Sequence, residues 1–316
     1  MVGPFPASWW ALVLGGSSGF GLAAAERLAA SGMSVAIVHR DRRGALPRIE
    51  PAFAALRDLG VPVHTWNADA LDPAVRARVV DELAGVLGED GRVRVLLHSI
   101  AFGSLKPLAP DPRPRNRALR ALAAELGMPE EELGARVAAL AQVGLDELQA
   151  FAPRPPAPDA PRLLDEEDFT RTIHAMGTSL LGWTRAVLDK GLFTRDARVL
   201  GLTSEGNTLA WRGYAAVSAA KVALEALSRS LAVELAPYGV RSNVIQAGIC
   251  DTPALRAIPG ADRLAANARL RNPFGRLTTP EDVAGAVALL ATDEAAWING
   301  SVLRVDGGEH VSGATW

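Results

Sequence analysis

The chain alternates between short apolar runs and longer amphipathic stretches. Trp10-Ala11-Leu12-Val13-Leu14 contains five consecutive apolar residues, which is typical of a parallel strand covered on both faces. Similar strands are predicted at 34–38, 61–66, 93–98, 199–203, 241–245 and 301–305. The helices predicted between them include 22–30, 72–88, 166–189, 212–236 and 280–292. This alternation predicts one α/β domain over residues 1–316, built on a doubly wound parallel sheet with its ligand site at the carboxyl ends of the strands.

One segment, 105–164, interrupts this alternation. Leu119, Leu122 and Leu126 share one helical face, and Leu133, Val137 and Leu140 share another. Gly127 can end the first helix and Pro129 can begin the second. Prolines bracket both helices, at 107, 110, 112 and 114 and again at 153, 155, 156, 158 and 161. We expect a helical hairpin inserted at the strand ends, acting either as a substrate lid or carrier-docking surface, or as a packing or oligomer contact.

A glycine-rich turn follows the first predicted strand. Gly15-Gly16-Ser17-Ser18-Gly19-Phe20-Gly21 leads directly into the first helix, which is the context of a dinucleotide-binding turn. Gly15 permits the tight turn, while Gly19 and Gly21 let the backbone and the helix start approach a pyrophosphate. The alternative is an ordinary glycine-rich turn without a ligand.

The end of the second strand indicates which dinucleotide binds. His39 stands where a carboxylate would accept a hydrogen bond from a ribose 2′-hydroxyl, and the cationic Arg40 and Arg42 follow it. We therefore predict NADPH rather than NADH. Asp41 either pairs with a neighbour or binds ribose. Asp69, after the third strand, either accepts a hydrogen bond from the adenine amino group or caps a helix.

Composition excludes several other classes of protein. The formal net charge is −2 and the pI is about 6.2, which disfavours a nucleic-acid partner. No apolar run reaches membrane-spanning length, and the first residues lack the basic region of a secretory signal. The single cysteine, Cys250, and five histidines without ligand spacing predict neither disulfides nor a metal site. We expect a cytoplasmic protein.

Lysine is scarce in this chain. Only three of its 33 basic residues are lysines, and one of them, Lys221, lies in an alanine-rich helical stretch. A compact ammonium that arginine cannot imitate would explain it there, although an ordinary surface lysine is the alternative. Tyr214 lies seven residues earlier, so in a helix the two side chains would share a face about 10.5 Å apart along the axis.

Together, the glycine turn, the Tyr/Lys helix and the segments 247–252 and 305–308 resemble the short-chain dehydrogenase/reductase family, whose fold is of the Rossmann type. The resemblance covers nearly the whole chain except the insertion. Most members place the active tyrosine four residues before the lysine, but Val217 stands at that position here. The Tyr-x6-Lys spacing and the stretch His98-Ser99-Ile100-Ala101-Phe102 are similar to the NADPH-using enoyl-acyl-carrier-protein reductases. Met176 stands where carbonyl reductases usually hold an asparagine.

The resemblance implies roles for individual residues. Tyr214 would donate a hydrogen bond to the enolate oxygen, and Lys221 would bind the nicotinamide ribose. Ser204 occupies the position of the family's catalytic serine and either orients the substrate carbonyl or satisfies a loop. Leu255, Ile258 and Leu264 in the segment 253–273 would cover an acyl chain. The expected cofactor contacts are Gly15, Ser17, Ser18, Gly19, Phe20, Gly21, His39, Arg40, Arg42, Asp69, Ala70, Ser99, Ile100, Ala101, Lys221, Gly248, Ile249 and Thr252.

Three functions follow as hypotheses. The first is NADPH-dependent reduction of 2-enoyl thioesters carried by acyl carrier protein or coenzyme A. There hydride goes to C3 while charge develops on an oxygen three bonds away, which suits a hydroxyl displaced by one helical turn. The second is a carbonyl reductase with Tyr214 as general acid. The third is an NADP(H)-binding sensor or scaffold without turnover. The resemblance also implies a homotetramer or homodimer, formed partly through the helices at 166–189 and 212–236.

Overall fold

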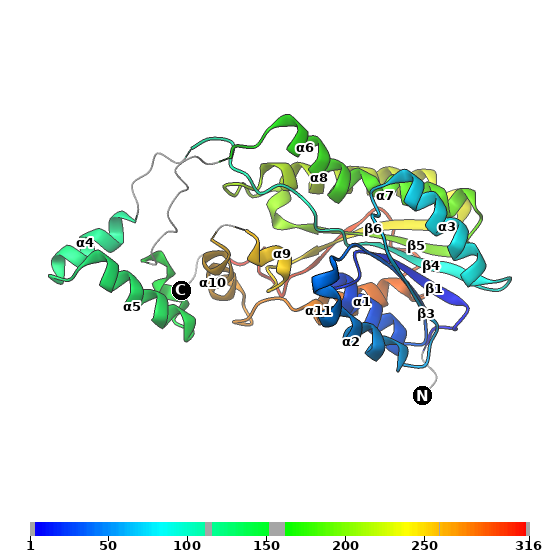
Figure 1. The fold of residues 1–316 in the computed structure, drawn as a ribbon, viewed down its shortest axis with the longest axis horizontal. Coiled ribbons are helices and arrows are strands. Elements are labelled where there is room, and N and C mark those ends of the chain that lie inside the picture. The colour runs from blue at the N-terminus through cyan, green and yellow to red at the C-terminus, as the bar shows by residue number, and fades with distance from the viewer. Residues whose placement is uncertain (1–3, 111–115, 152–161, 259, 314–316) are drawn as a thin grey trace.

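A parallel sheet of seven strands forms the centre of the domain (Figure 1). The computed structural model describes residues 4–110, 116–151, 162–258 and 260–313. The strand order is β3-β2-β1-β4-β5-β6-β7, so the chain winds outward from β1 in both directions, as predicted. The strands are β1 (Trp9–Leu14), β2 (Ser34–His39), β3 (Val63–Asn67), β4 (Arg92–His98), β5 (Phe193–Ser204), β6 (Val240–Ala247) and β7 (Val302–Val305).

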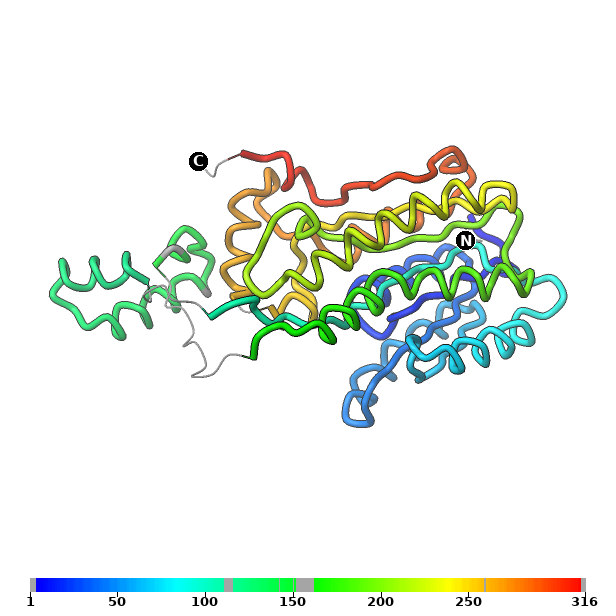
Figure 2. The backbone as a smooth tube through the Cα atoms, turned by 90° about the horizontal axis from the view of Figure 1, so that it is seen from above, coloured from blue at the N-terminus to red at the C-terminus, as the bar shows by residue number. Residues whose placement is uncertain are grey.

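Helices cover both faces of this sheet (Figures 1 and 2). Alternate residues of β1 point to opposite faces, so Ala11 and Val13 enter one core and Leu12 and Leu14 enter the other. The first core lies under α1 (Gly19–Ala30), α2 (Leu46–Arg57) and α11 (Pro280–Ala291). The second lies under α3 (Pro73–Leu87), α7 (Ser179–Asp189) and α8 (Ala215–Glu234). No helix among the described residues is long and apolar enough to cross a membrane.

The helix predicted over 166–189 is interrupted. It consists of α6 (Glu166–Ile173), a π-helical turn at His174–Thr178, and α7. The turn packs closely on α8, because a Cβ atom on Gly177 would lie 2.7 Å from the carbonyl oxygen of Ala220. The π-helical turn lies at this contact with another helix, so the sequence pattern of residues 166–189 taken alone did not reveal it.

The insertion forms the predicted helical hairpin, α4 (Arg117–Glu125) and α5 (Glu130–Gln142). Leu119, Leu133 and Val137 are buried in a small core of their own. Leu126 and Leu140, however, are 57% and 43% exposed, so each predicted apolar face is shorter than expected. The hairpin lies on the side of the strands' carboxyl ends, with α10 between it and the sheet (Figure 1).

The ends of the hairpin follow the predicted signals. Gly127, with φ 62°, lies just beyond α4, and Pro129 immediately precedes α5. A 3-10 turn at Asp146–Ala150 then brings the insertion against α10 (Ala261–Arg271) in the body of the domain. The predicted bracketing prolines at 112, 114, 153, 155, 156, 158 and 161 lie outside the described residues.

Two arginines are buried inside the sheet. Arg94 on β4 and Arg198 on β5 are 1% and 0% exposed, and both pair with Asp196, at 2.7 and 2.6 Å. Their Nε atoms donate to the carbonyl oxygens of Ala291 and Leu290 at the end of α11. These contacts join two central strands to a covering helix, and Asp196 is the carboxylate that both arginines share, while Arg94 also pairs with Asp293 at 2.8 Å.

Replacing that carboxylate should therefore destabilise the fold. We expect Asp196→Ala to lower the free energy of unfolding by about 3 kcal/mol or more, because it removes the carboxylate that Arg198 pairs with and leaves buried Arg94 with Asp293 alone. Urea unfolding followed by circular dichroism measures the change. Asp81→Ala, which removes an exposed partner of Lys190, is the matched control and should cost less than about 1 kcal/mol. Equal losses in the two variants would contradict the assignment.

Candidate active site

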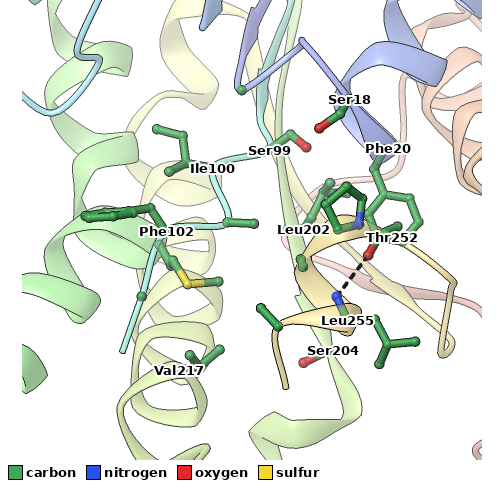
Figure 3. A pocket seen from close by; sticks show the side chains of 18 of the residues that line it. Ser18, Phe20, Ser99, Ile100, Phe102, Leu202, Ser204, Val217, Thr252 and Leu255 are labelled. Atoms are coloured by element: carbon green, nitrogen blue, oxygen red, sulfur yellow. Dashed lines mark hydrogen bonds between the residues drawn. The ribbon is translucent and has the colours of Figure 1, made fainter. Parts of the chain in front are cut away.

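A cavity of about 510 Å³ opens at the carboxyl ends of the strands (Figure 3). Its wall is formed by the glycine turn after β1, by the ends of β2 to β6, and by α8 and the segment after Thr252. The three predicted catalytic residues, Tyr214, Lys221 and Ser204, all line it. All the expected cofactor contacts line it too, with two exceptions, Gly21 and Arg42.

The glycine turn shapes one end of the cavity. Gly15 has φ 85°, and a Cβ there would lie 2.6 Å from the Ser99 carbonyl oxygen, so only glycine fits. Gly21 lies behind this turn rather than in the cavity wall. A Cβ atom on Gly21 would lie 2.2 Å from the Gly15 carbonyl oxygen. The Ser18 side chain makes no capping hydrogen bond to α1. The first amide groups of α1 can therefore bind an anion, as a pyrophosphate site requires.

His39 and Asp41 pair with each other at the end of β2. His39 Nδ1 lies 2.8 Å from Asp41 Oδ2, and the His39 ring is 5% exposed against the edge of Phe53. Asn67 holds the backbone of Asp41 on both its N–H and its C=O. Of the two predicted roles for Asp41, the structure shows the pairing with a neighbour. Arg42 is exposed and lies outside the cavity.

Arg40 spans the cavity wall beside them. Its Nη1 donates to Asp69 Oδ2 at 2.7 Å, and its guanidinium lies 4.4 Å from the centre of the Phe102 ring. Burial would raise the pKa of Asp69, but the Leu71 amide and Arg40 hold it below its usual value. The cap of α3 is Asp72 and not Asp69, which corrects one of the two predicted roles for Asp69.

Tyr214 and Ser204 form the polar centre of the cavity. The hydroxyl oxygens of the two side chains lie 3.1 Å apart, and the Tyr214 side chain is 8% exposed with its ring 5.1 Å from that of Trp211. Burial raises the pKa of Tyr214, and the hydrogen bond with Ser204 offsets part of this rise. Tyr214 precedes α8 as its N-cap rather than lying within a helix as predicted, because Gly213, with φ 77°, prevents an earlier start.

Lys221 is buried below them. Its Nζ donates to the carbonyl oxygen of Leu202 at 2.8 Å, and its side chain is 7% exposed. Burial lowers the pKa of Lys221 to about 8, although Glu225, one turn further along α8, acts in the opposite direction. The Glu225 carboxylate accepts hydrogen bonds from Thr203 and Asn207, so it is held in place by the end of β5.

The remaining wall is mostly apolar. Trp211 and Ile258 join two apolar clusters, one on α8 and the π-helical turn, the other on the segment after Thr252. Val217 and Met176 belong to the first cluster and line the cavity. Leu255 and Ile258 line it as predicted, whereas Leu264 packs behind them.

Sequence reasoning did not single out Trp211 or Phe102 as part of this cavity. Trp211 packs against Tyr214, and Phe102, which follows β4, lies against Arg40, which follows β2. The only available signal was sequence proximity, since Trp211 is three residues before Tyr214 and Phe102 ends the stretch 98–102. Aromatic residues near a motif are too common to indicate a cavity wall by themselves.

Two other polar residues near the cavity, His98 and Cys250, are buried in surroundings that suit a structural role rather than a chemical one. His98 is fully buried and bonded to Ser179 Oγ at 2.8 Å, and burial together with Lys221 lowers the pKa of His98 to about 3, so it stays neutral. Burial raises the pKa of the Cys250 thiol to about 12, which leaves it unreactive. Within the described residues, no group of three or more histidine, cysteine, aspartate or glutamate side chains could hold a metal ion.

The lowered pKa of Lys221 should appear as a dependence of stability on pH. The unfolded chain keeps this lysine protonated up to about pH 10.4, whereas the folded chain loses the proton above about pH 8. Over that pH window the unfolded state binds more protons than the folded state. The folded protein therefore becomes more stable as the pH rises, because it no longer has to bury the Lys221 charge. We expect the difference in unfolding free energy between wild type and Lys221→Met to shift by about 1 kcal/mol in favour of wild type from pH 8 to pH 9.

Urea unfolding at a series of pH values tests this. The comparison with Lys221→Met cancels the other groups that titrate in the same range, such as Cys250. A difference that stays constant from pH 7 to pH 9.5 would show that Lys221 has an ordinary pKa.

Comparison with known proteins identifies the family. A family model described as "Enoyl-(Acyl carrier protein) reductase" matches residues 148–310, and a model described as "short chain dehydrogenase" matches residues 9–110. The 3-oxoacyl-acyl-carrier-protein reductase MabA of Mycobacterium tuberculosis is 30% identical over 297 residues, which are 94% of this chain and 91% of MabA. The corresponding reductase FabG of Vibrio cholerae is 33% identical over 148 residues, 47% of this chain, and the match spans only 60% of its length.

Solved structures show the same fold. A short-chain dehydrogenase from Burkholderia cenocepacia in complex with NADP has a TM-score of 0.68 at 23% identity, over 96% of this chain and 98% of the other. An enoyl-acyl-carrier-protein reductase from Anaplasma phagocytophilum in complex with NAD has a TM-score of 0.68 at 20% identity, over 100% and 98%. With the sheet order, the glycine turn and the Ser–Tyr–Lys cavity, these matches place the chain in the short-chain dehydrogenase/reductase family.

Proposed function

We propose that this protein is an NADPH-dependent reductase of 2-enoyl thioesters, presented on acyl carrier protein or coenzyme A. The observation that carries the proposal is the placement of Tyr214, whose hydroxyl meets Ser204 in the cavity while Val217 occupies the usual position of the family's tyrosine. Val217 and Met176 make the wall beside Tyr214 apolar where a carbonyl reductase would hold polar groups. The neighbouring Leu255 and Ile258 suit an acyl chain.

The cavity fits a nicotinamide dinucleotide phosphate. The open N-terminus of α1 can receive the pyrophosphate, and Lys221 can donate to the nicotinamide ribose. The Asp41 carboxylate is engaged by His39, while Arg40 offers a cation at the wall, which favours a 2′-phosphate over a 2′-hydroxyl. NADP is also what the Burkholderia cenocepacia structure contains, according to its description. The bound cofactor would supply the hydride.

The chain's own residues would stabilise the charge that hydride transfer creates. Addition of hydride to C3 of the enoyl group moves negative charge onto the thioester oxygen. The Tyr214 hydroxyl keeps its proton at neutral pH, since a phenol ionises only near pH 10 and burial raises the pKa of Tyr214 further, and it can donate to that oxygen. Ser204, 3.1 Å away, fixes the direction of the Tyr214 hydroxyl. Hydrogen bonds placed in advance where charge develops are a major source of catalysis.

Reduction of 3-oxoacyl thioesters is the second candidate. The match to MabA, a 3-oxoacyl-acyl-carrier-protein reductase, extends over 94% of this chain. The Ser204–Tyr214 pair could also polarise a ketone, with Tyr214 as general acid. The association of two or four copies remains a prediction in either case.

The two candidates differ in substrate. We expect NADPH oxidation, followed at 340 nm, with crotonyl thioesters and little with acetoacetyl thioesters. Tyr214→Phe should lower kcat on crotonyl thioester by about 100-fold, since it removes a hydrogen bond made mainly to the developing charge. Tyr238→Phe is the matched control, because this second tyrosine is 61% exposed and lies outside the cavity. Turnover of acetoacetyl thioester alone would replace the proposal by the second candidate, and binding without any turnover would favour a sensor.

Arg40 should determine the choice of cofactor. We expect Arg40→Ser to raise the Kd for NADPH by about tenfold and to leave the Kd for NADH nearly unchanged, because only NADPH carries the 2′-phosphate. Quenching of protein fluorescence on titration measures both constants. Arg57→Ser, at an exposed arginine of α2 outside the cavity, is the control. Equal weakening of NADPH and NADH would contradict this role.

A further inference from the structure

Helix α10 connects the insertion to the cavity. It follows the segment that lines the cavity after Thr252, and it lies between the 3-10 turn of the insertion and the body of the domain (Figure 1). The only fully buried side chains of α10 are those of Ala266 and Ala268. Leu264 adds a partly buried apolar contact, and charged contacts at the last turn of the helix supplement this apolar packing.

Two arginines in the last turn of α10 make charged contacts in different directions. Arg269 forms a two-pronged pair with Asp146 of the insertion, with Nε and Nη2 each 2.6 Å from one carboxylate oxygen. Asp146 is 7% exposed, so this pair is shielded from solvent on the carboxylate side. This pair joins the insertion to α10 through two charge-assisted hydrogen bonds.

Arg271 points instead toward the catalytic loop. Its Nη2 lies 2.7 Å from a carboxylate oxygen of Glu205 and 2.7 Å from one of Glu309. Glu205 directly follows Ser204, and the second oxygen of Glu309 accepts the Ile249 N–H at 3.1 Å. Both carboxylates are buried, at 6% and 1% exposure. One guanidinium therefore joins the loop that carries Ser204 to the loop expected to contact the nicotinamide.

Removing Arg271 would leave two buried carboxylates near each other without a cation. Burial already raises the pKa of Glu309, and Arg271 and the Ile249 amide oppose this rise. The two loops would then move apart, or the carboxylates of Glu205 and Glu309 would take up protons. Either change alters the cavity wall at Ile249 and Ser204.

We propose that α10 is a brace in which Arg269 and Arg271 act as positioning residues, so that the insertion sets the geometry of the substrate wall through Asp146. In this arrangement the insertion is neither a lid nor an independent module. It limits the movement of α10, and α10 in turn holds the segment that covers the acyl chain. The inference rests on the proposed function in one respect, because it takes this wall of the cavity as the place where the thioester binds.

The test separates the two ends of the brace. In the full-length protein, Asp146→Asn breaks the insertion end and Arg271→Met breaks the catalytic end. We expect amide hydrogen exchange in 261–271 to accelerate about threefold or more in both variants, since a local restraint is lost. The exchange of the Ile249 amide should accelerate only in Arg271→Met.

Kinetics should show the same separation. With the thioester that the wild type reduces, Asp146→Asn should raise KM by about tenfold and change kcat by less than about threefold, because it loosens a binding wall far from the reacting atoms. Arg271→Met should lower kcat as well and weaken NADPH binding. Arg271→Lys, which keeps a cation able to reach one carboxylate, should restore part of the loss.

Two exposed ion pairs supply controls. Arg136→Met removes a pair with Glu132 inside the insertion, and Arg276→Met removes a pair with Asp282 just after α10. Neither should change the exchange of 261–271. Unchanged exchange in both Asp146→Asn and Arg271→Met, or equal acceleration in the controls, would overturn the brace. If the wild type reduces neither thioester, the proposed function fails, while the exchange experiment still decides this inference.

Discussion

The site depends on the parallel direction of all seven strands. Because the strands run the same way, their carboxyl ends meet along one edge, and every loop that leaves a strand begins beside the same cavity. The register of β1 with β4 places the glycine turn against Ser99, and the register of β5 with β6 places Ser204 beside Ala247. Residues that are far apart in the sequence thus share one wall, and some of them contact one another there, as Arg40 contacts Asp69 and Phe102.

Burial gives the polar residues of this wall their chemical properties. Lys221 lies under the cavity with its ammonium against a backbone carbonyl, and desolvation lowers its pKa, whereas the same desolvation raises the pKa of Tyr214. The phenol therefore keeps a proton to donate, and the lysine stays close to the point where it loses its charge. Opposite shifts in two neighbouring groups are typical of sites that handle protons.

Two sets of ion pairs in this molecule have different places in the fold. Asp196 pairs with the buried arginines of the sheet, which in turn donate to the end of α11. The pairs of Arg269 and Arg271 lie on a helix with little apolar burial of its own, and they connect the insertion to the catalytic loop. The first set stabilises the framework, while the second set forms the brace that we propose for the cavity wall. In the proposed brace, the insertion lies beyond α10 and acts on the cavity through that helix (Figure 1).

Local pattern in the sequence was enough for the strand and helix alternation, the glycine turn and the hairpin in the insertion, while the resemblance to a family placed Ser204, Tyr214 and Lys221 in one site. Each of these depends on residues close together in the chain or on the rule that parallel strand ends coincide. Pattern did not reveal that Tyr214 caps α8, because the start of that helix depends on the backbone of Gly213. It also could not assign partners to Arg271, since pairing across 66 residues to Glu205 is decided by how α10 packs. Tertiary structure alone selects such partners, because a charge pairs with whichever opposite charge the fold brings near it.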